Sequence, residues 1–124
     1  MSAVVALLGR VLMSAIFIEG GWGKLTHFSR TVGLMGGDNL PVPSVTAAVV
    51  VAVELLGGLA ILAGLRTRPV ALLLAVYCVA TAFIAHFHPG DTNNMIHFMK
   101  NICMAGGFLQ LVAWGPGRYS VDRR

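Results

Sequence analysis

The stretch "VVVAVELLGGLAILAGL", residues 49–65, is apolar except for a single carboxylate, Glu54. A helix that crosses the hydrocarbon core of a bilayer needs about 20 mostly apolar residues. The segment 44–65 around this stretch has that length and composition, so we expect it to span a membrane. At 1.5 Å rise per residue, Glu54 would then lie about 15 Å from either surface, near the bilayer centre.

The whole chain has the composition of a membrane protein. Its 124 residues are 56% hydrophobic and only 11% charged, and the mean hydropathy is +0.78. Three further windows resemble the first, at residues 4–21, 69–87 and 94–114. We read 4–21 as a retained helix and not as a signal peptide, because Arg10 interrupts its apolar run. The sequence predicts one all-α domain over 1–124, an integral membrane four-helix bundle in the lipid bilayer.

The basic residues predict the orientation of this bundle. Four spans place both termini on one side, where the turn after 65 and the tail carry arginines at 66, 68, 118, 123 and 124. The other side has Lys24 and Arg30, with Lys100 just inside a helix. Cytoplasmic segments are enriched in Lys and Arg, so both termini are expected in the cytoplasm. We attribute the net charge of +4 to this bias, and no nucleic-acid-binding motif is present.

The connections between the windows also carry signals. In the first loop, apolar residues recur at helical spacing, which favours a short helix lying in the headgroup plane: Leu25, Phe28, Val32 and Met35. The glycines and prolines of "GGDNLPVP" (36–43) should end that helix. In "HPGDTNN" (88–94), Thr92 or Asn94 is expected to cap the last helix.

Glu54 should face the interior of the bundle. Insertion scales put an acidic side chain at the centre of a spanning helix at roughly +2.5 to +3.5 kcal/mol, so we expect it to be protonated or paired. Gly57 and Gly58 lie on the same helical face, where missing side chains let a neighbouring helix approach.

Arg10 is the partner that the sequence favours for Glu54. Residue counting places it about 6 Å nearer the cytoplasm, within reach of a guanidinium stem. Three interpretations stay open: a structural ion pair between two helices, a pocket in which Glu54 exchanges a proton or binds a polar ligand group, and Arg10 extending alone to the surface.

A second set of polar residues gathers near the outer ends of the predicted helices. This outer polar cluster comprises Glu19, His86, His88, Asn94, His97, Lys100 and Asn101. A Glu19–Lys100 ion pair, or a solvated Glu19, is one interpretation, and a polar vestibule built by the whole set is the other.

The histidines and cysteines give little support to metal or dithiol chemistry. His86 and His88 are two residues apart, which splays them on a helix, and no paired Cys/His spacing accompanies them, so we predict no metal site. Cys78 and Cys103 are expected at similar depths. Small residues in a lipid-facing or core position are the favoured interpretation, and a dithiol redox pair is the alternative.

Several segments in this order resemble the DoxX family of small bacterial four-helix membrane proteins: "GRVLMSAIFIEGGWGKL" (9–25), "LPVPS" (40–44), "VELLGGLAILAGLRTR" (53–68), "FMKNICMAGGFLQL" (98–111) and "WGPGRYSVD" (114–122). The residues that carry the resemblance are Arg10, Gly20, Lys24, Glu54, Gly57, Gly58, Lys100, Asn101, Gly106 and Gly107. The resemblance implies a multi-pass protein of the bacterial inner membrane that is associated with quinone-linked, thiosulfate or thiol redox systems. It transfers no catalytic role to any residue.

The residues fit an accessory subunit of an oxidoreductase better than a stand-alone enzyme. The chain has no Rossmann glycine fingerprint, P-loop, CxxCH haem motif or iron–sulfur cysteine set, so we expect no tightly bound flavin or haem. Membrane quinone is the cofactor that we consider, because a pocket bordered by polar groups could hydrogen-bond a quinone oxygen. The expected ligand-binding residues are Arg10, Glu54, Tyr77 and Thr81.

Two other functions remain open. One is an oligomeric transporter for a small solute, which would need a homo-oligomer because four helices are too few for an internal repeat. The other is a scaffold that anchors soluble redox enzymes through the basic turn at Arg66 and Arg68 and the tail.

Overall fold

The computed structural model describes residues 2–37 and 41–122, and Arg123 and Arg124 lie outside this part. The described residues form helices and contain no strand: α1 (Ser2–Thr26), α2 (Phe28–Gly37), α3 (Pro43–Ala63), α4 (Thr67–Thr81), the π-helix η1 (Ala82–His86) and α5 (Thr92–Trp114). The predicted all-helical fold is thereby confirmed. Within the described part of the chain, three helical segments are long and apolar enough to cross a membrane: Ser2–Thr26, Pro43–Ala63 and Thr67–His86.

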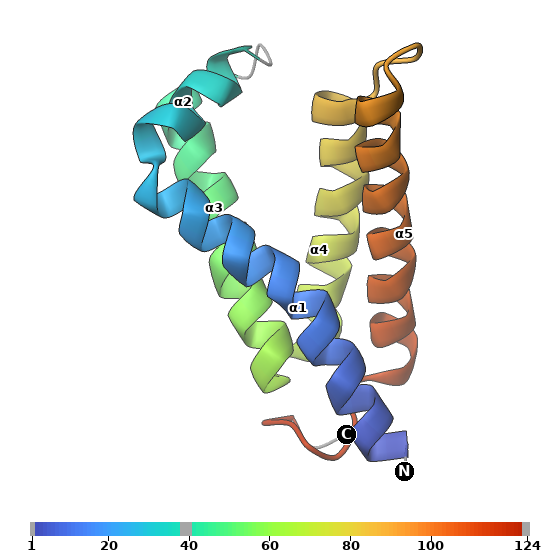
Figure 1. The fold of residues 1–124 in the computed structure, drawn as a ribbon. Coiled ribbons are helices and arrows are strands. Elements are labelled where there is room, and N and C mark those ends of the chain that lie inside the picture. Colours follow the sequence, from blue (N-terminus) through green and yellow to red (C-terminus); the bar gives the residue numbers. More distant parts are fainter. Residues whose placement is uncertain (1, 38–40, 123–124) are drawn as a thin grey trace.

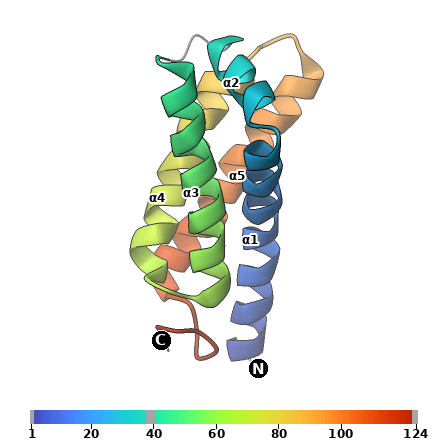
Figure 2. The same cartoon turned by 90° about the vertical axis from the view of Figure 1, so that its left-hand side faces the viewer.

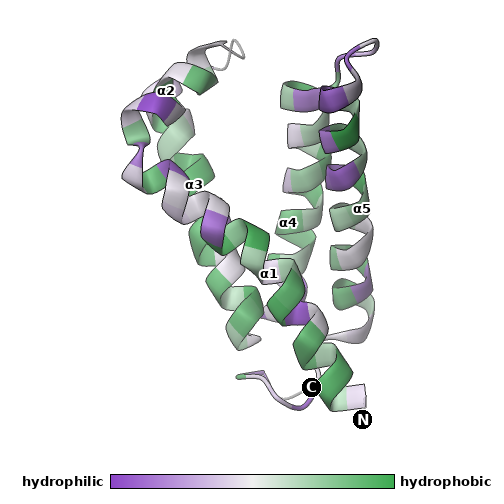
Figure 3. Ribbon diagram, in the orientation of Figure 1, coloured by the Kyte–Doolittle hydropathy of each residue, from purple (hydrophilic) through white to green (hydrophobic). Residues whose placement is uncertain are grey.

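α5 differs from these three helices in composition. Its 23 residues are sufficient in length. His97, Lys100 and Asn101 lower its hydropathy, and it is not among the segments that are apolar enough to span. Figure 3 shows hydrophilic residues in α2 and in the half of α5 near the α4–α5 turn.

The helices are arranged as two pairs. α1 packs along α3, and α4 packs along α5. In Figure 1 the pairs diverge towards the end that carries α2 and the α4–α5 turn, while both termini lie at the opposite end. Figure 2 shows the same arrangement from the side of α1 and α3.

Glycines set the close contact between α1 and α3. A Cβ added at Gly21 would lie 2.8 Å from the backbone nitrogen of Leu55, and one at Gly58 would lie 2.9 Å from the Ile18 side chain. Gly57 faces α4 instead. The expectation that the glycine pair beside Glu54 admits neighbouring helices is confirmed.

An apolar core joins the two pairs. Phe17 and Phe108 meet edge-to-face with ring centroids 5.4 Å apart, and Ile61, Leu74 and Cys78 are buried beside them. Because this core occupies the part where the pairs converge, the diverging part is left for the cavity described below.

Arg10 belongs to a separate polar contact near the termini. Its side chain is 1% exposed. Nη1 donates to the carbonyls of Ile61 and Leu62 at 3.1 and 2.7 Å. Nε donates to the Pro116 carbonyl at 3.0 Å, and Nη2 donates to that of Tyr119. The guanidinium therefore satisfies carbonyls at the end of α3 and ties the tail to α1 and α3.

The expected Arg10–Glu54 ion pair is wrong. In the α1–α3 register a Cβ at Gly20 would lie 3.1 Å from Glu54 Oε1, so Gly20 is the residue opposite Glu54. Arg10 is ten residues away, about 15 Å along the helix. The prediction aligned the two helices by the ends of their apolar windows, and this alignment does not give the true register between α1 and α3.

The tail closes the end of the bundle where the termini lie. The backbone nitrogens of Val121 and Asp122 donate to the carbonyls of Ala63 and Gly64 at 3.0 and 2.9 Å. The Asp122 carboxylate in turn accepts from the backbone nitrogens at the start of α4. A side chain far away in sequence thus caps α4.

Helix ends differ from the predicted windows in two places that matter for the site. The first helix continues to Thr26, beyond the predicted end at residue 21. The last helix begins at Thr92 and is capped by Asp91, whose side chain accepts from the Asn94 backbone nitrogen at 3.2 Å. The expected caps, Thr92 and Asn94, are wrong, because Asp91 has the extended backbone that an N-cap requires. The short helix expected in the first loop is present as α2.

Candidate functional site

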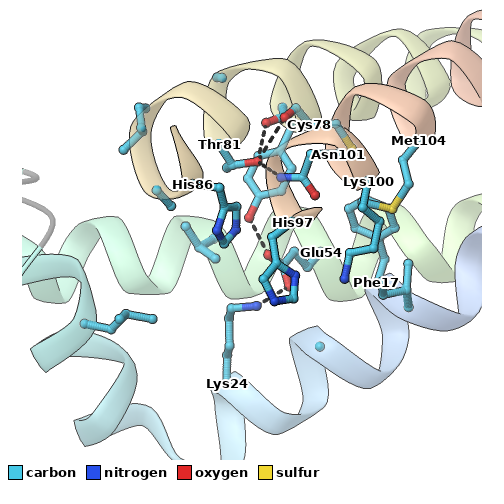
Figure 4. Close-up of a pocket in the computed structure, with 18 of the residues that line it drawn as sticks. Phe17, Lys24, Glu54, Cys78, Thr81, His86, His97, Lys100, Asn101 and Met104 are labelled. Carbon is cyan, nitrogen blue, oxygen red and sulfur yellow. Dashed lines mark hydrogen bonds and ion pairs between the residues drawn. The ribbon is translucent and has the colours of Figure 1, made fainter. Parts of the chain in front are cut away.

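A cavity of about 450 Å³ lies between the two helix pairs. Residues of α1, α2, α3, α4, η1 and α5 line it, and most of the wall is apolar. A volume of this size is in the range of small-molecule sites. Figure 4 shows its polar residues on facing walls.

Glu54 is the centre of the polar network in this cavity. Glu54 is 8% exposed, counted over the whole residue. Oε1 accepts a hydrogen bond from Lys24 Nζ of α1 at 2.8 Å, which is also an ion pair. Oε2 accepts from the hydroxyl of Tyr77 on α4. The acid is therefore inward and paired, as its depth predicted, but with Lys24 as its partner.

Lys24 is the site residue that the sequence reasoning missed. The apolar window ends near residue 21, which places Lys24 in the first loop. Phe17, Gly20 and Lys24 follow helical spacing, and all three line the cavity. Continuing the helix by one turn would have placed Lys24 on this face.

A second polar contact joins α4 to α5. Thr81 Oγ1 donates to the Tyr77 carbonyl at 2.9 Å and accepts from Asn101 Nδ2 at 3.1 Å. Since Asn101 is 8% exposed, this hydrogen bond is largely shielded from solvent. It holds the polar face of α5 against the same wall that carries Tyr77.

Two histidines and a lysine complete the cavity wall. The rings of His86 and His97 lie 5.4 Å apart between centroids. His86 is the last residue of the π-helix η1, and π-helical turns are frequent at functional sites. Lys100 extends from α5 into the cavity (Figure 4).

The cavity is lined by some, but not all, of the expected ligand-binding residues and of the outer polar cluster. Of the expected ligand-binding residues, Glu54, Tyr77 and Thr81 line the cavity, and Arg10 does not. Of the outer polar cluster, the residues on the wall are His86, His97, Lys100 and Asn101.

The other three members of the outer polar cluster lie elsewhere. Glu19 is exposed on α1 and forms no ion pair with Lys100 among the described side chains. The alternative of an ion pair is therefore wrong, and the exposed Glu19 agrees with the other alternative, a solvated charge. His88 is exposed in the α4–α5 turn. Asn94 donates through Nδ2 to Asp91 at 2.9 Å.

The cysteines are both free thiols. Cys78 is buried and lines the cavity, whereas Cys103 is exposed. Within residues 2–37 and 41–122, no group of three or more His, Cys, Asp or Glu side chains is arranged to hold a metal ion.

Comparison with known proteins gives consistent matches. The sequence profile of the DoxX family matches residues 5–87. Inner membrane protein YqjF of Escherichia coli (strain K12) is 42% identical over 120 residues, which cover 97% of this chain and 91% of the relative. Inner membrane protein YphA of the same organism is 39% identical over 126 residues, covering 98% and 90%. No solved structure matches the chain.

Proposed function

Since the chain belongs to the DoxX family and is an integral inner-membrane protein, we propose that it is a non-catalytic or co-catalytic membrane subunit of a quinone-linked or thiol redox system. The observation that carries the proposal is the cavity in which Glu54 joins Lys24 and Tyr77. Ionisable groups inside a membrane domain are costly, so a network of them around a cavity favours a functional site.

The proposal includes four membrane spans with both termini in the cytoplasm. Its support is that α5 lies along α4 and that the two termini are at one end of the molecule. The basic residues Arg66, Arg68 and Arg118 lie in the turn and tail of that end and are exposed. The polar side chains of α5 are accommodated because several of them face the cavity and not lipid.

The ligand that we favour is a lipid-soluble molecule with a polar head, and quinone is the leading candidate. A quinone carries two electrons and two protons between membrane proteins. The Lys24 ammonium has further N–H donors beyond its bond to Glu54 and could bind a ring oxygen, and Glu54 could accept a proton from the cavity. The apolar wall would contact the ring and the start of its tail.

A redox subunit of this kind needs a protein partner. We place a soluble redox enzyme at the basic end formed by the α3–α4 turn and the tail, since its exposed arginines would attract an acidic surface. Replacing Arg66 and Arg68 by Gln should weaken capture of such a partner in a pull-down, and replacing the exposed Glu19 by Gln should not.

Co-purification tests the ligand proposal. Wild-type protein, Glu54→Gln and the control Glu19→Gln are purified in the same detergent, and bound lipid-soluble molecules are identified by mass spectrometry. We expect quinone with the wild type and with Glu19→Gln, and at least a fivefold loss with Glu54→Gln. Absence of quinone from the wild type, or equal amounts in all three, would remove the quinone assignment.

A further inference from the structure

The charges on the cavity wall do not balance. Lys24 and Lys100 line the cavity from α1 and α5, and Glu54 is the carboxylate between them. Glu54 is paired with Lys24 at 2.8 Å. Among the described residues, Lys100 has no ion-pair or hydrogen-bond partner. The polar wall therefore carries one positive charge that no carboxylate among residues 2–37 and 41–122 neutralises.

The neighbours of Lys100 on α5 set the face of the helix on which it lies. Asn101 is tied to Thr81 of α4 at 3.1 Å, which sets the rotation of α5 at this level. His97 lies one turn before Lys100 and lines the same cavity. Figure 4 shows the Lys100 side chain extending into the space that Glu54 faces from the opposite wall.

Lys100 is an exposed residue that lines the cavity, so an anion can reach its ammonium. At membrane depth, pairing with an anion would offset the cost of an unmatched charge. The Lys24–Glu54 pair does not compete for the anion, because its charges already neutralise each other. Lys100 is left as the group that binds the head of the ligand. The remaining wall supplies apolar contacts from Ile16, Leu34, Val50, Ile84 and Met104.

We propose that this cavity selects a monoanionic amphiphile, a single anionic oxygen group on an apolar body, and that Lys100 binds the anionic oxygen. This inference rests on the proposed lipid-soluble ligand site and names the charge of its ligand. A long-chain carboxylate and the phenolate of a reduced quinone share this chemistry, and the test below separates the two sources.

The experiment measures binding to protein in phosphatidylcholine nanodiscs by equilibrium dialysis, with empty nanodiscs subtracted. The probes are dodecanoate, its uncharged match dodecanol, and a short-tailed quinone in its oxidised and reduced forms. The variants are Lys100→Gln, the charge-retaining Lys100→Arg, and Arg68→Gln as a basic control at the other end of the molecule.

We expect dodecanoate to bind saturably and at least tenfold more tightly than dodecanol. Lys100→Gln should weaken dodecanoate binding at least tenfold and leave dodecanol unchanged, whereas Lys100→Arg and Arg68→Gln should resemble the wild type. If only the reduced quinone shows this dependence on Lys100, the ligand is the phenolate and the inference stands.

The inference is overturned if dodecanol binds as tightly as dodecanoate and no probe responds to Lys100→Gln. If oxidised quinone still binds under those conditions, and this binding depends on Glu54, the anion site is refuted and the proposed function is retained. Conversely, binding of dodecanoate through Lys100 without binding of either quinone form would uphold the anion site and remove the quinone assignment.

Discussion

At the scale of single residues, Glu54 is held by partners from two other helices. Lys24 supplies the charge and Tyr77 the second hydrogen bond. The Lys24 side chain is 31% exposed and that of Glu54 is 10% exposed, so the pair lies in a partly shielded environment, where an ion pair is stronger than at an open surface. The effects of removing the two partners should therefore not add.

A double-mutant cycle checks this coupling. Lys24→Met and Glu54→Gln should each destabilise the protein, because each leaves the other group unpaired. The double variant should recover roughly 1–3 kcal/mol relative to the sum of the single effects. Thermal unfolding in detergent gives the values, and additive effects would show that the pair contributes no coupling.

Arg10 should contribute to stability and not to ligand binding. Arg10→Met removes the donors for buried carbonyls, including those of Ile61 and Pro116, and we expect a loss of about 3 kcal/mol or more. The tail should also become sensitive to protease. Arg68→Met is the control, since Arg68 is exposed. Loss of quinone from a stably folded Arg10→Met protein would contradict this role.

The sequence predicts the surroundings of a residue correctly where these depend only on its depth in the membrane. The cost of a central carboxylate correctly predicted that Glu54 faces inward and is paired, and Tyr77 and Thr81 line the cavity as expected. Its partner depends on the register between two helices. Register is set by glycine contacts such as Gly21 against Leu55, and no pattern within one helix reveals it.

At the scale of elements, close helix contact and helix capping define the frame of the site. Close helix contact can be tested with two glycines of α1, Gly21 and Gly23, which are two residues apart. Gly21→Ala would force a Cβ to 2.8 Å from the Leu55 backbone, whereas a Cβ at Gly23 meets nothing within 4 Å. We expect a loss of roughly 1–3 kcal/mol for Gly21→Ala and no loss for Gly23→Ala. Equal unfolding temperatures would refute tight α1–α3 packing.

The start of α5 gives a test that depends on pH. Hydrogen bonds from the Asn94 backbone and side chain lower the pKa of Asp91. A lowered pKa in the folded state means that the carboxylate stabilises the fold above its unfolded pKa and that this effect is lost as the pH falls through the folded pKa. Asp91→Ala should lower the unfolding temperature at neutral pH. The difference should shrink below about pH 4, and a pH-independent difference would contradict the charged cap.

At the scale of the whole molecule, two helix pairs converge at the end with the termini and diverge at the other (Figure 1). Hydropathy predicted the helices and their order, because span length is a local property. It did not predict the divergence of the pairs, which depends on where the core of Phe17, Leu74 and Phe108 is placed. The cavity is a consequence of this global arrangement.

The four-span topology can be tested directly. Cysteines introduced at Gly90 and Ser120 should react with a membrane-impermeant thiol reagent from opposite sides of the inner membrane. Gly90 should be labelled from the periplasm, and Ser120 only after permeabilisation. A background without Cys78 and Cys103 is required, because both thiols are free. Labelling of both positions from one side would exclude α5 as a span.

Glu54, paired with Lys24, is proposed to face a ligand inside the membrane domain. Infrared difference spectroscopy of wild type against Glu54→Gln, with and without a short-tailed quinone, can detect its carboxylate and its response to the ligand. We predict a carboxylate band that is absent from the variant and that shifts when quinone is added to the wild type. A band from residue 54 that does not respond to quinone, in a protein whose quinone binding is unaffected by Glu54→Gln, would contradict it.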